Sequence, residues 1–244
     1  MQIKNVPLAG FVKIGNDDAL LVIDMQNDFL PDGALPVADG DKIIDGINAL
    51  VAKFHQKENP VIFTQDWHPK DHHSFASVHP GKNPYDLFEA PGVGPILWPD
   101  HCVQGTKGAN FAPQLQTVEA TLILRKGFHK MIDSYSAFLE NDKETETGLR
   151  TYLDAIGIKR VFLCGLALDY CVYYSAIDAR NYGFDVVYLL DLTKPVNSPE
   201  NSVSDALQTM IDHNIVFITS DQVLVDLTPQ DKSSGDEVDF FESK

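Results

Sequence analysis

The sequence predicts an α/β fold, with a doubly wound, mostly parallel six-stranded sheet and helices on both faces. Segments rich in β-branched and apolar residues alternate with segments whose apolar residues recur at helical spacing, which is the pattern of such a sheet. The chain has 244 residues and is 44% hydrophobic, enough for one large core. We therefore predict a single domain over residues 1–229, followed by a flexible acidic tail over 230–244.

The first half of the chain supplies two strands, one helix and a long loop. A strand is predicted over 19–24, where the run is apolar up to Asp24. Asp41 can cap a helix with one apolar face, and Pro60 precedes a second strand over 61–66. The apolar face of that helix consists of Ile43, Ile44, Ile47, Leu50, Val51 and Phe54. The polar stretch that runs on to about residue 115 is rich in Pro, Gly and His, and its length indicates a functional loop.

The second half continues the alternation of strands and helices. Gly157 is placed to end one helix, and the next helix follows Cys171 and stops near Gly183. Ser198 and Pro199 are expected to start the last helix. The remaining strands are predicted over 120–126, 160–164, 184–191 and 215–218, with a helix over 145–156 between the first two.

Composition limits the partners of the protein. The formal net charge of −16 argues against nucleic acid or an anionic membrane, because both require a basic face. The sequence has no apolar run of membrane-spanning length and no charged-then-apolar leader. Three cysteines without paired-motif spacing, Cys102, Cys164 and Cys171, suit a reducing compartment. We expect a cytoplasmic protein with a small-molecule substrate, and whether it forms a homo-oligomer is left open.

Polar groups follow several of the predicted strands. The carboxyl ends of parallel strands share one edge, where ligands bind. Asp24, Lys126 and Cys171 each stand at or just after a strand end, so a nucleophile, a carboxylate base and a cation are expected to meet there. Asp191 also ends a predicted strand. The alternative is that the aspartates only cap turns and that the cysteine is a buried structural residue.

Histidines are concentrated in the long loop. Asp66 and His68 lie on the same side of an extended backbone, because alternate residues face one way. Imidazole with carboxylate suits a divalent ion such as zinc, iron or manganese. A third ligand must come from elsewhere, and His101 is a candidate. The alternative is an ordinary solvent-facing loop. The five loop histidines are His68, His72, His73, His79 and His101.

Five motifs occur in order between Ala19 and Asp191: LLVIDMQNDF, QDWHP with HHSFAS, LWPDHCVQGT, ILRKG with DSYSAF, and GLALDYCV. Together they resemble the nicotinamidases of the isochorismatase-like cysteine hydrolases. The resemblance implies a doubly wound α/β fold and the hydrolysis of nicotinamide to nicotinate and ammonia. It also implies a bound divalent metal ion and pyrazinamide as a second substrate.

The same resemblance assigns catalytic roles. Cys171 would be the nucleophile, Asp24 the general base and acid, and Lys126 the cation that completes the triad. Lys126 and the helix N-terminus would lower the pKa of the Cys171 thiol. The peptide before Ala167 would be cis, and the N–H groups of Ala167 and Cys171 would form the oxyanion hole.

The resemblance also assigns ligands and walls of the site. Asp66, His68 and His101 would hold the metal, and His72 matches a position that only some relatives use. Leu168 departs from the pattern, because threonine is usual there. The aromatic residues expected to line the substrate site are Phe29 and Trp98, followed by Tyr135 and Tyr170, for which core packing is the alternative.

Two other functions are weighed against this one. The first is another cysteine amidohydrolase of the same superfamily, acting on a ureido, carbamoyl or maleamate substrate, which would not need the metal ligands. The second is a non-catalytic binding protein on this fold, which would not need Asp24, Lys126 and Cys171 together.

Overall fold

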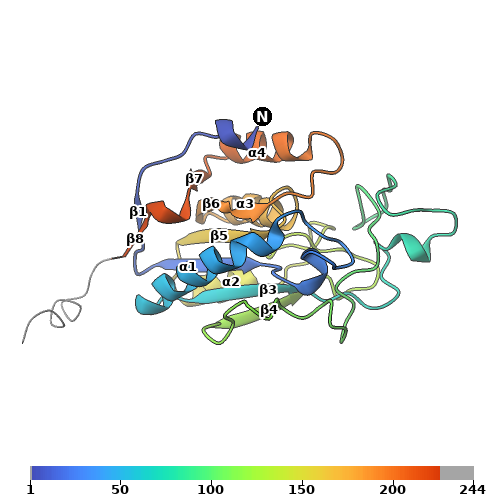
Figure 1. Ribbon diagram of the computed structural model, residues 1–244, viewed down its shortest axis with the longest axis horizontal. Coiled ribbons are helices and arrows are strands. Elements are labelled where there is room, and N and C mark those ends of the chain that lie inside the picture. The colour runs from blue at the N-terminus through green and yellow to red at the C-terminus, as the bar shows by residue number, and fades with distance from the viewer. Residues whose placement is uncertain (1, 226–244) are drawn as a thin grey trace, which may run out of the picture.

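The predicted α/β fold is confirmed by a computed structural model that describes residues 2–225 (Figure 1). Six parallel strands form the main sheet in the order β4-β3-β2-β5-β6-β7. The chain moves outward from β2 in one direction and then returns to build the other half, so the order reverses between β2 and β5. That switch point is where a doubly wound sheet leaves a crevice for a ligand. The strands are β2 (Asp18–Ile23), β3 (Val61–Asp66), β4 (Leu122–Lys126), β5 (Arg160–Leu166), β6 (Asp185–Lys194) and β7 (Val216–Ile218).

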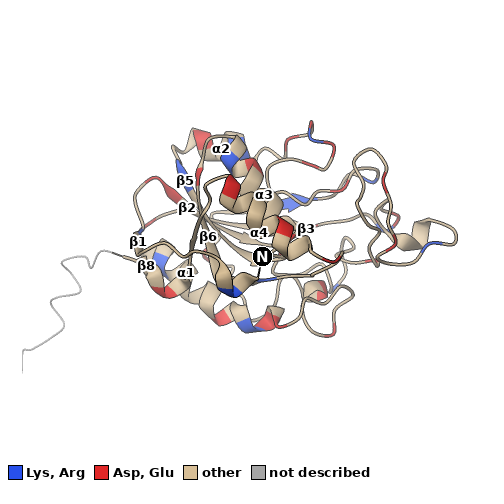
Figure 2. Cartoon of the chain, turned by 90° about the horizontal axis from the view of Figure 1, so that it is seen from above, with Lys and Arg blue, Asp and Glu red and all other residues tan. Residues whose placement is uncertain are grey.

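Helices cover both faces of this sheet (Figure 2). α1 (Ile44–Gln56) lies on one face, and α2 (Leu149–Ala155) and α3 (Cys171–Asn181) lie on the other. α4 (Ser202–Asp212) packs against α3. Because the sheet is covered on both sides, every residue of β2 and of β3 is buried. A two-stranded sheet of β1 (Val12–Lys13) and β8 (Val223–Leu224) was not predicted.

The segment between β3 and β4 forms part of the wall above the carboxyl edge of the sheet, to which it contributes Trp98 and His101. It runs outward beyond the strand ends and is drawn in cyan and green in Figure 1. Isolated bridges hold it in place, among them His68 with Val103 and Phe75 with Trp98. In the part of the chain that the structure describes, this segment contains no α-helix and one 3-10 turn over Ala76–Val78. The predicted long loop is therefore present, and its functional role stays a prediction.

Several predicted boundaries were wrong. Asp41 does not cap α1, because a 3-10 turn over Gly40–Ile43 precedes the helix. Gly148, at φ 91°, delays the start of α2 to Leu149. Pro199 precedes α4 by three residues and follows a cis peptide, so it does not open the helix.

Asp191 is not at a strand end. The register between β5 and β6 jumps from Leu163–Tyr188 to Gly165–Thr193, and the irregularity carries β6 on to Lys194. The Asp191 carboxylate accepts hydrogen bonds from the N–H and hydroxyl of Ser220. This aspartate therefore fastens the 3-10 turn Ser220–Gln222 to the sheet, and it is not among the residues that line the cavity.

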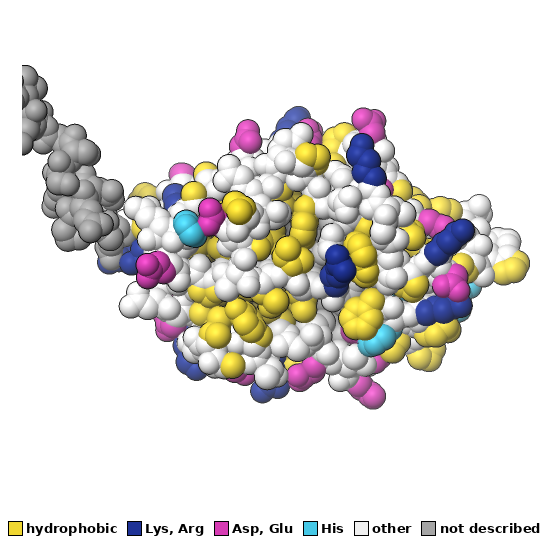
Figure 3. Space-filling view, turned by 90° about the horizontal axis from the view of Figure 1, so that it is seen from below, with side chains coloured by type: hydrophobic (Ala, Val, Ile, Leu, Met, Phe, Trp, Pro, Cys, Tyr) yellow, Lys and Arg dark blue, Asp and Glu magenta, His cyan; other side chains and the backbone are white. Residues whose placement is uncertain are grey.

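The structure shows how basic side chains are spread over one face of the protein. Lys and Arg side chains lie singly among acidic and apolar ones on the face seen in Figure 3, with no basic patch. None of the helices within residues 2–225 has the length and apolar character needed to cross a membrane. The predicted acidic tail over 230–244 lies outside the described residues, and the single domain over 1–229 stays a prediction.

Gly165 is the tightest point in the core of the sheet. Its φ is 109°, and an added Cβ would lie 2.1 Å from the carbonyl oxygen of Ile23. We expect Gly165→Ala to lower the free energy of unfolding by about 3 kcal/mol or more, because both the backbone conformation and the contact become unfavourable. Urea unfolding measures this change. Gly10→Ala, at a site with open space around it, is the control, and equal stability of the two variants would contradict the argument.

Candidate active site

Lys126 organises the carboxyl edge of the sheet. This residue ends β4, and its side chain is fully buried. Its ammonium lies 2.9 Å from Asp24 Oδ2 and 2.5 Å from Asp66 Oδ1. It also donates to the carbonyl of Ser134 at 2.7 Å and lies 3.5 Å from Cys171 Sγ. One cation therefore holds together the ends of three strands and the first residue of α3.

Asp24 follows β2 directly and is buried with a φ of 48°. Thr64, two residues before the end of β3, donates its hydroxyl to Asp24 Oδ1 at 2.6 Å. Burial raises the pKa of Asp24 to about 6, and the Lys126 ammonium and the Thr64 hydroxyl oppose that rise. A carboxylate with such a pKa can accept and return a proton near neutral pH.

Cys171 is the first residue of α3, and its thiol lies close to Asp24. The Sγ atom and carboxylate oxygens of Asp24 and Asp66 all lie within 4.8 Å of one another. Burial raises the pKa of the Cys171 thiol well above its usual value, and Lys126 offsets only part of that rise. The expected lowering of this pKa was therefore wrong, because the loops above the sheet exclude water from the sulfur. The resting side chain is a thiol beside a base.

The turn between β5 and α3 presents two unused backbone donors. The Leu166–Ala167 peptide is cis, as the resemblance implied. Within residues 2–225, the N–H groups of Ala167 and Cys171 have no hydrogen-bond partner. Leu168 instead donates its N–H to Lys194 and accepts from the Tyr188 hydroxyl, so backbone bonds fix the turn where a threonine side chain is usual.

Three buried side chains beside this centre form a set of metal donors. The Nε2 atoms of His68 and His101 lie 3.6 Å and 4.0 Å from Asp66 Oδ2. The Nδ1–H group of His68 donates to the carbonyl of Gly127, and that of His101 donates to the carbonyl of Pro99, both at 2.8 Å. These bonds leave the lone pair of each Nε2 free, which is how histidine ligands are oriented at metal sites.

The charges of the donor set also suit a divalent ion. Burial and the neighbouring His68 lower the pKa of His101 to about 4, so its imidazole is neutral near pH 7. Burial lowers the pKa of His68 too, but Asp66, Asp133 and the Gly127 carbonyl together outweigh it, and the net shift is upward. A metal ion would take the place of the proton that this imidazole attracts. The donors therefore fit zinc, iron or manganese.

His72 lies within 4.8 Å of His68 and Asp133, in a group separate from that of Asp66, His68 and His101. Its Nδ1 accepts from the Ser74 hydroxyl at 2.7 Å, and its Nε2 lies 3.2 Å from the carbonyl of Ile132, to which it donates. Both ring nitrogens are thus engaged with the protein. His73 and His79 contact each other away from this group.

An aromatic cavity lies beside the Cys171 thiol and the metal donors. All four predicted aromatic residues line it, together with Asp66, His101, Ala167 and Cys171. The indole N–H of Trp98 donates to the Tyr135 hydroxyl at 3.0 Å, and the Tyr135 hydroxyl donates to Gly94. The Trp98 and Tyr170 rings meet edge to face at 4.9 Å. These contacts fix the walls around a flat ligand.

Sequence reasoning missed several residues of the site. Leu35, Asp133 and Val196 also line the cavity. Thr64 lies on the same strand face as Asp66, and this alternation could have identified it. Asp133 is the first residue of the DSYSAF motif, and its place in that motif is the one sequence feature that could have marked it as a site residue. No local pattern distinguished Leu35 or Val196.

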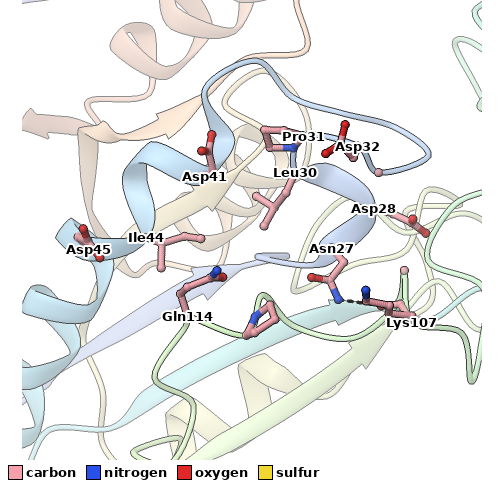
Figure 4. A pocket seen from close by; sticks show the side chains of 13 residues that line it. Asn27, Asp28, Leu30, Pro31, Asp32, Asp41, Ile44, Asp45, Lys107 and Gln114 are labelled. Carbon is pink, nitrogen blue, oxygen red and sulfur yellow. Dashed lines mark hydrogen bonds between the residues drawn. The ribbon is translucent and has the colours of Figure 1, made fainter.

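Figure 4 shows a second, larger pocket on the outer side of the loop that carries Phe29. Asp32, Asp41 and Asp45 lie around it, and Asn27 donates to the carbonyl of Lys107. Its lining residues include neither the thiol nor the metal donors, so we place the candidate active site in the smaller aromatic cavity.

The isochorismatase domain model matches residues 18–222. The chain belongs to the isochorismatase family. It is 45% identical over 214 residues to a nicotinamidase of Acinetobacter baylyi, covering 88% of this chain and 98% of the relative.

Two solved structures resemble this isochorismatase-family chain closely. PnC1 from L. infantum in complex with nicotinate has a TM-score of 0.76 and 38% identity, covering 88% of this chain and all of that one. The pyrazinamidase of Pyrococcus horikoshii in complex with zinc has a TM-score of 0.67 and 37% identity. It covers 83% of this chain and 99% of the other.

The thiol environment gives a testable consequence. Lys126→Met should raise the pKa of Cys171 further, because the cation that favours the thiolate is lost. The pH at which iodoacetamide modifies Cys171 should rise by about 1 to 3 units. Mass spectrometry of the Cys171 peptide measures the modification. Lys130→Met, which removes an exposed lysine paired with Asp71, is the control, and an unshifted profile in Lys126→Met would remove Lys126 from the thiol's environment.

Proposed function

We propose that this protein hydrolyses nicotinamide to nicotinate and ammonia. The observation that carries the proposal is that one aromatic cavity is lined by the Cys171 thiol, beside which Asp24 lies, and by two of the three metal donors, Asp66 and His101. A pyridine carboxamide has one group for each part of this site. Its carboxamide carbon would face the thiol, and its ring nitrogen would face the metal donors.

The relatives support the same assignment. The Acinetobacter baylyi relative is a nicotinamidase, and the solved neighbours hold nicotinate and zinc. Pyrazinamide, which keeps a ring nitrogen and the carboxamide, is proposed as a second substrate. An amidohydrolase acting on a ureido, carbamoyl or maleamate substrate would leave the donors of Asp66, His68 and His101 without a role.

In the proposed acylation step, Asp24 takes the proton of the Cys171 thiol as the sulfur attacks the carboxamide carbon. Lys126 stabilises the negative charge that passes between the carboxylate and the sulfur. The N–H groups of Ala167 and Cys171 donate to the oxyanion, and such a donor typically contributes about 3–4 kcal/mol. Asp24 then gives the proton to the departing ammonia, which leaves a nicotinoyl thioester.

In the proposed hydrolysis step, Asp24 takes a proton from water, which attacks the thioester carbon. The same two N–H groups hold the second oxyanion. Nicotinate leaves, and the proton returns to the Cys171 sulfur. The carboxylate thus acts as base in each half of the reaction, and its pKa of about 6 suits both directions of transfer.

The walls and the metal donors orient the ring. Phe29, Trp98, Tyr135 and Tyr170 contact its faces and edges, and Asp66, His68 and His101 would hold the metal ion. When bound, the ion supplies a Lewis acid for the pyridine nitrogen and so fixes the ring relative to the thiol. Zinc, iron and manganese are the proposed metals, and the cytoplasmic location stays a prediction.

Cys171→Ala tests the nucleophile. We expect ammonia release from nicotinamide to fall at least about 10⁴-fold, because no other group replaces the thiol. Cys164→Ala is the matched control, since Cys164 lies fully buried in β5, where its loss should cost stability and little activity. Comparable rates in wild type and Cys171→Ala would overturn the cysteine mechanism.

Benzamide tests the role of the metal donors, because it has almost the shape of nicotinamide but lacks the ring nitrogen. We expect kcat/KM for nicotinamide to exceed that for benzamide by about 10³-fold or more. His68→Ala should lower the nicotinamide value much more than the benzamide value, and His73→Ala should change neither. Chelation and metal addition should abolish and restore the preference. Equal losses for both substrates in His68→Ala would rule out recognition of the ring by the metal.

A further inference from the structure

Thr64 carries a buried hydroxyl that contacts the proposed base, Asp24, and not the substrate cavity. It lies on β3, two residues before Asp66, and is fully buried. The hydroxyl oxygen makes two contacts with the same residue: it accepts the N–H of Asp24 at 3.1 Å and lies 2.6 Å from Asp24 Oδ1. Thr64 is not among the residues that line the cavity. Any effect of this hydroxyl on the reaction would therefore pass through Asp24.

The first contact fixes the direction of the second. A backbone N–H can only donate, so the Thr64 oxygen is the acceptor in its bond with the Asp24 backbone. The single hydroxyl hydrogen has no acceptor other than Asp24 Oδ1 in the part of the chain that the structure describes. A proton on Oδ1 would either face that hydrogen or leave it without an acceptor, and both are unfavourable in a buried place. Thr64 therefore keeps Oδ1 unprotonated.

The other carboxylate oxygen of Asp24 receives no hydrogen. Oδ2 lies 2.9 Å from the Lys126 ammonium and feels its charge. An ammonium has three hydrogens, and those of Lys126 have three other acceptors. These acceptors are Asp66 Oδ1, the carbonyl of Ser134 and Cys171 Sγ. Among residues 2–225, Oδ2 is accordingly a buried oxygen without a hydrogen-bond partner, which makes it the open position for a proton.

We propose that Thr64 is a positioning residue that gives the two oxygens of Asp24 different roles: Oδ1 is a fixed acceptor, and Oδ2 alone carries the proton. This inference deepens the proposed nicotinamide hydrolysis and rests on it. As the S–C bond forms, the proton of the Cys171 thiol moves to Oδ2 and the π electrons of the carbonyl move to its oxygen. The carbonyl then re-forms as the C–N bond breaks, and the departing nitrogen takes the proton from Oδ2.

The test compares Thr64→Val with Thr64→Ser. Valine keeps the shape of threonine without the hydroxyl, so the Asp24 carboxylate is free to turn away from the thiol. General acid–base catalysis contributes about 10²- to 10⁴-fold, and we expect kcat for nicotinamide to fall about 10-fold or more in Thr64→Val. KM should stay within about 3-fold, because Thr64 does not line the cavity. Serine restores the hydroxyl, so Thr64→Ser should keep kcat within about 3-fold of wild type.

Thr121→Val is the matched control. The hydroxyl of Thr121 accepts the N–H of Val61 at 3.1 Å, at the opposite end of β3. Its removal takes an acceptor from the same strand without affecting Asp24, so kcat should stay within about 2-fold. Thermal unfolding checks that each variant is folded. A folded Thr64→Val variant with the kcat of wild type would overturn the proposal, as would equal losses in Thr64→Val and Thr64→Ser.

Neutron diffraction from deuterated wild-type crystals tests the proposal without a variant, and so does not depend on the folding of Thr64→Val. At neutral pD we expect the deuteron of the Thr64 hydroxyl to point at Asp24 Oδ1. The three deuterons of the Lys126 ammonium should point at its other acceptors. A deuteron bound to Oδ1, or a Lys126 deuteron directed at Oδ2, would contradict the assignment of the two oxygens.

The outcomes also separate this inference from the proposed function. If wild type releases ammonia from nicotinamide and Cys171→Ala does not, the thiol mechanism holds. Full activity in a folded Thr64→Val variant then contradicts only the role of Thr64. If wild type does not hydrolyse nicotinamide, the proposed function fails first, and the inference that rests on it fails with it.

Discussion

The buried ammonium of Lys126 is the interaction on which the rest of the site depends. Two carboxylates and a thiol converge where water is excluded, and each would be driven toward its neutral form without a cation among them. Because Lys126 contacts Asp24 and Asp66 at once, one carboxylate is available to the thiol and the other to a metal ion. The Lys126–Asp24 contact beside the thiol and the Lys126–Asp66 contact beside the metal donors therefore share one positive charge. Its removal would disturb the sheet edge and the chemistry together.

Asp66 links the two halves of the site. One of its oxygens faces Lys126 and the other faces the two imidazoles. Its backbone is held by the side chain of Gln26, which donates to the Asp66 carbonyl at 2.8 Å and accepts its N–H at 2.7 Å. The Gln26 side-chain amide thus makes the pair of hydrogen bonds that a backbone would make if β2 continued beside β3. Displacement of this side chain would move Asp66, and with it the metal donors and the Lys126 ammonium.

Much of the site could be predicted because its residues stand at strand ends, where topology alone brings them to one edge. Asp24 and Lys126 stand at the ends of β2 and β4, and Cys171 begins the helix after β5, all elements that a simple periodicity identifies. The parts that could not be predicted depend on contacts between distant segments. The extension of β6 past Asp191 arises from an irregular register, and the raised pKa of Cys171 arises from loops that cover the sulfur.

The protonated resting state of Cys171 also bears on the durability of the protein. Peroxides oxidise thiolates to sulfenic acid far more readily than they oxidise thiols, and exposed thiolates are attacked first. A sulfur that stays protonated under a covering of aromatic rings is a poor target for such oxidants. In the proposed mechanism, the sulfur becomes reactive only when Asp24 removes its proton during attack on a bound carbonyl. The burial that makes the thiol weakly acidic therefore also preserves it between turnovers.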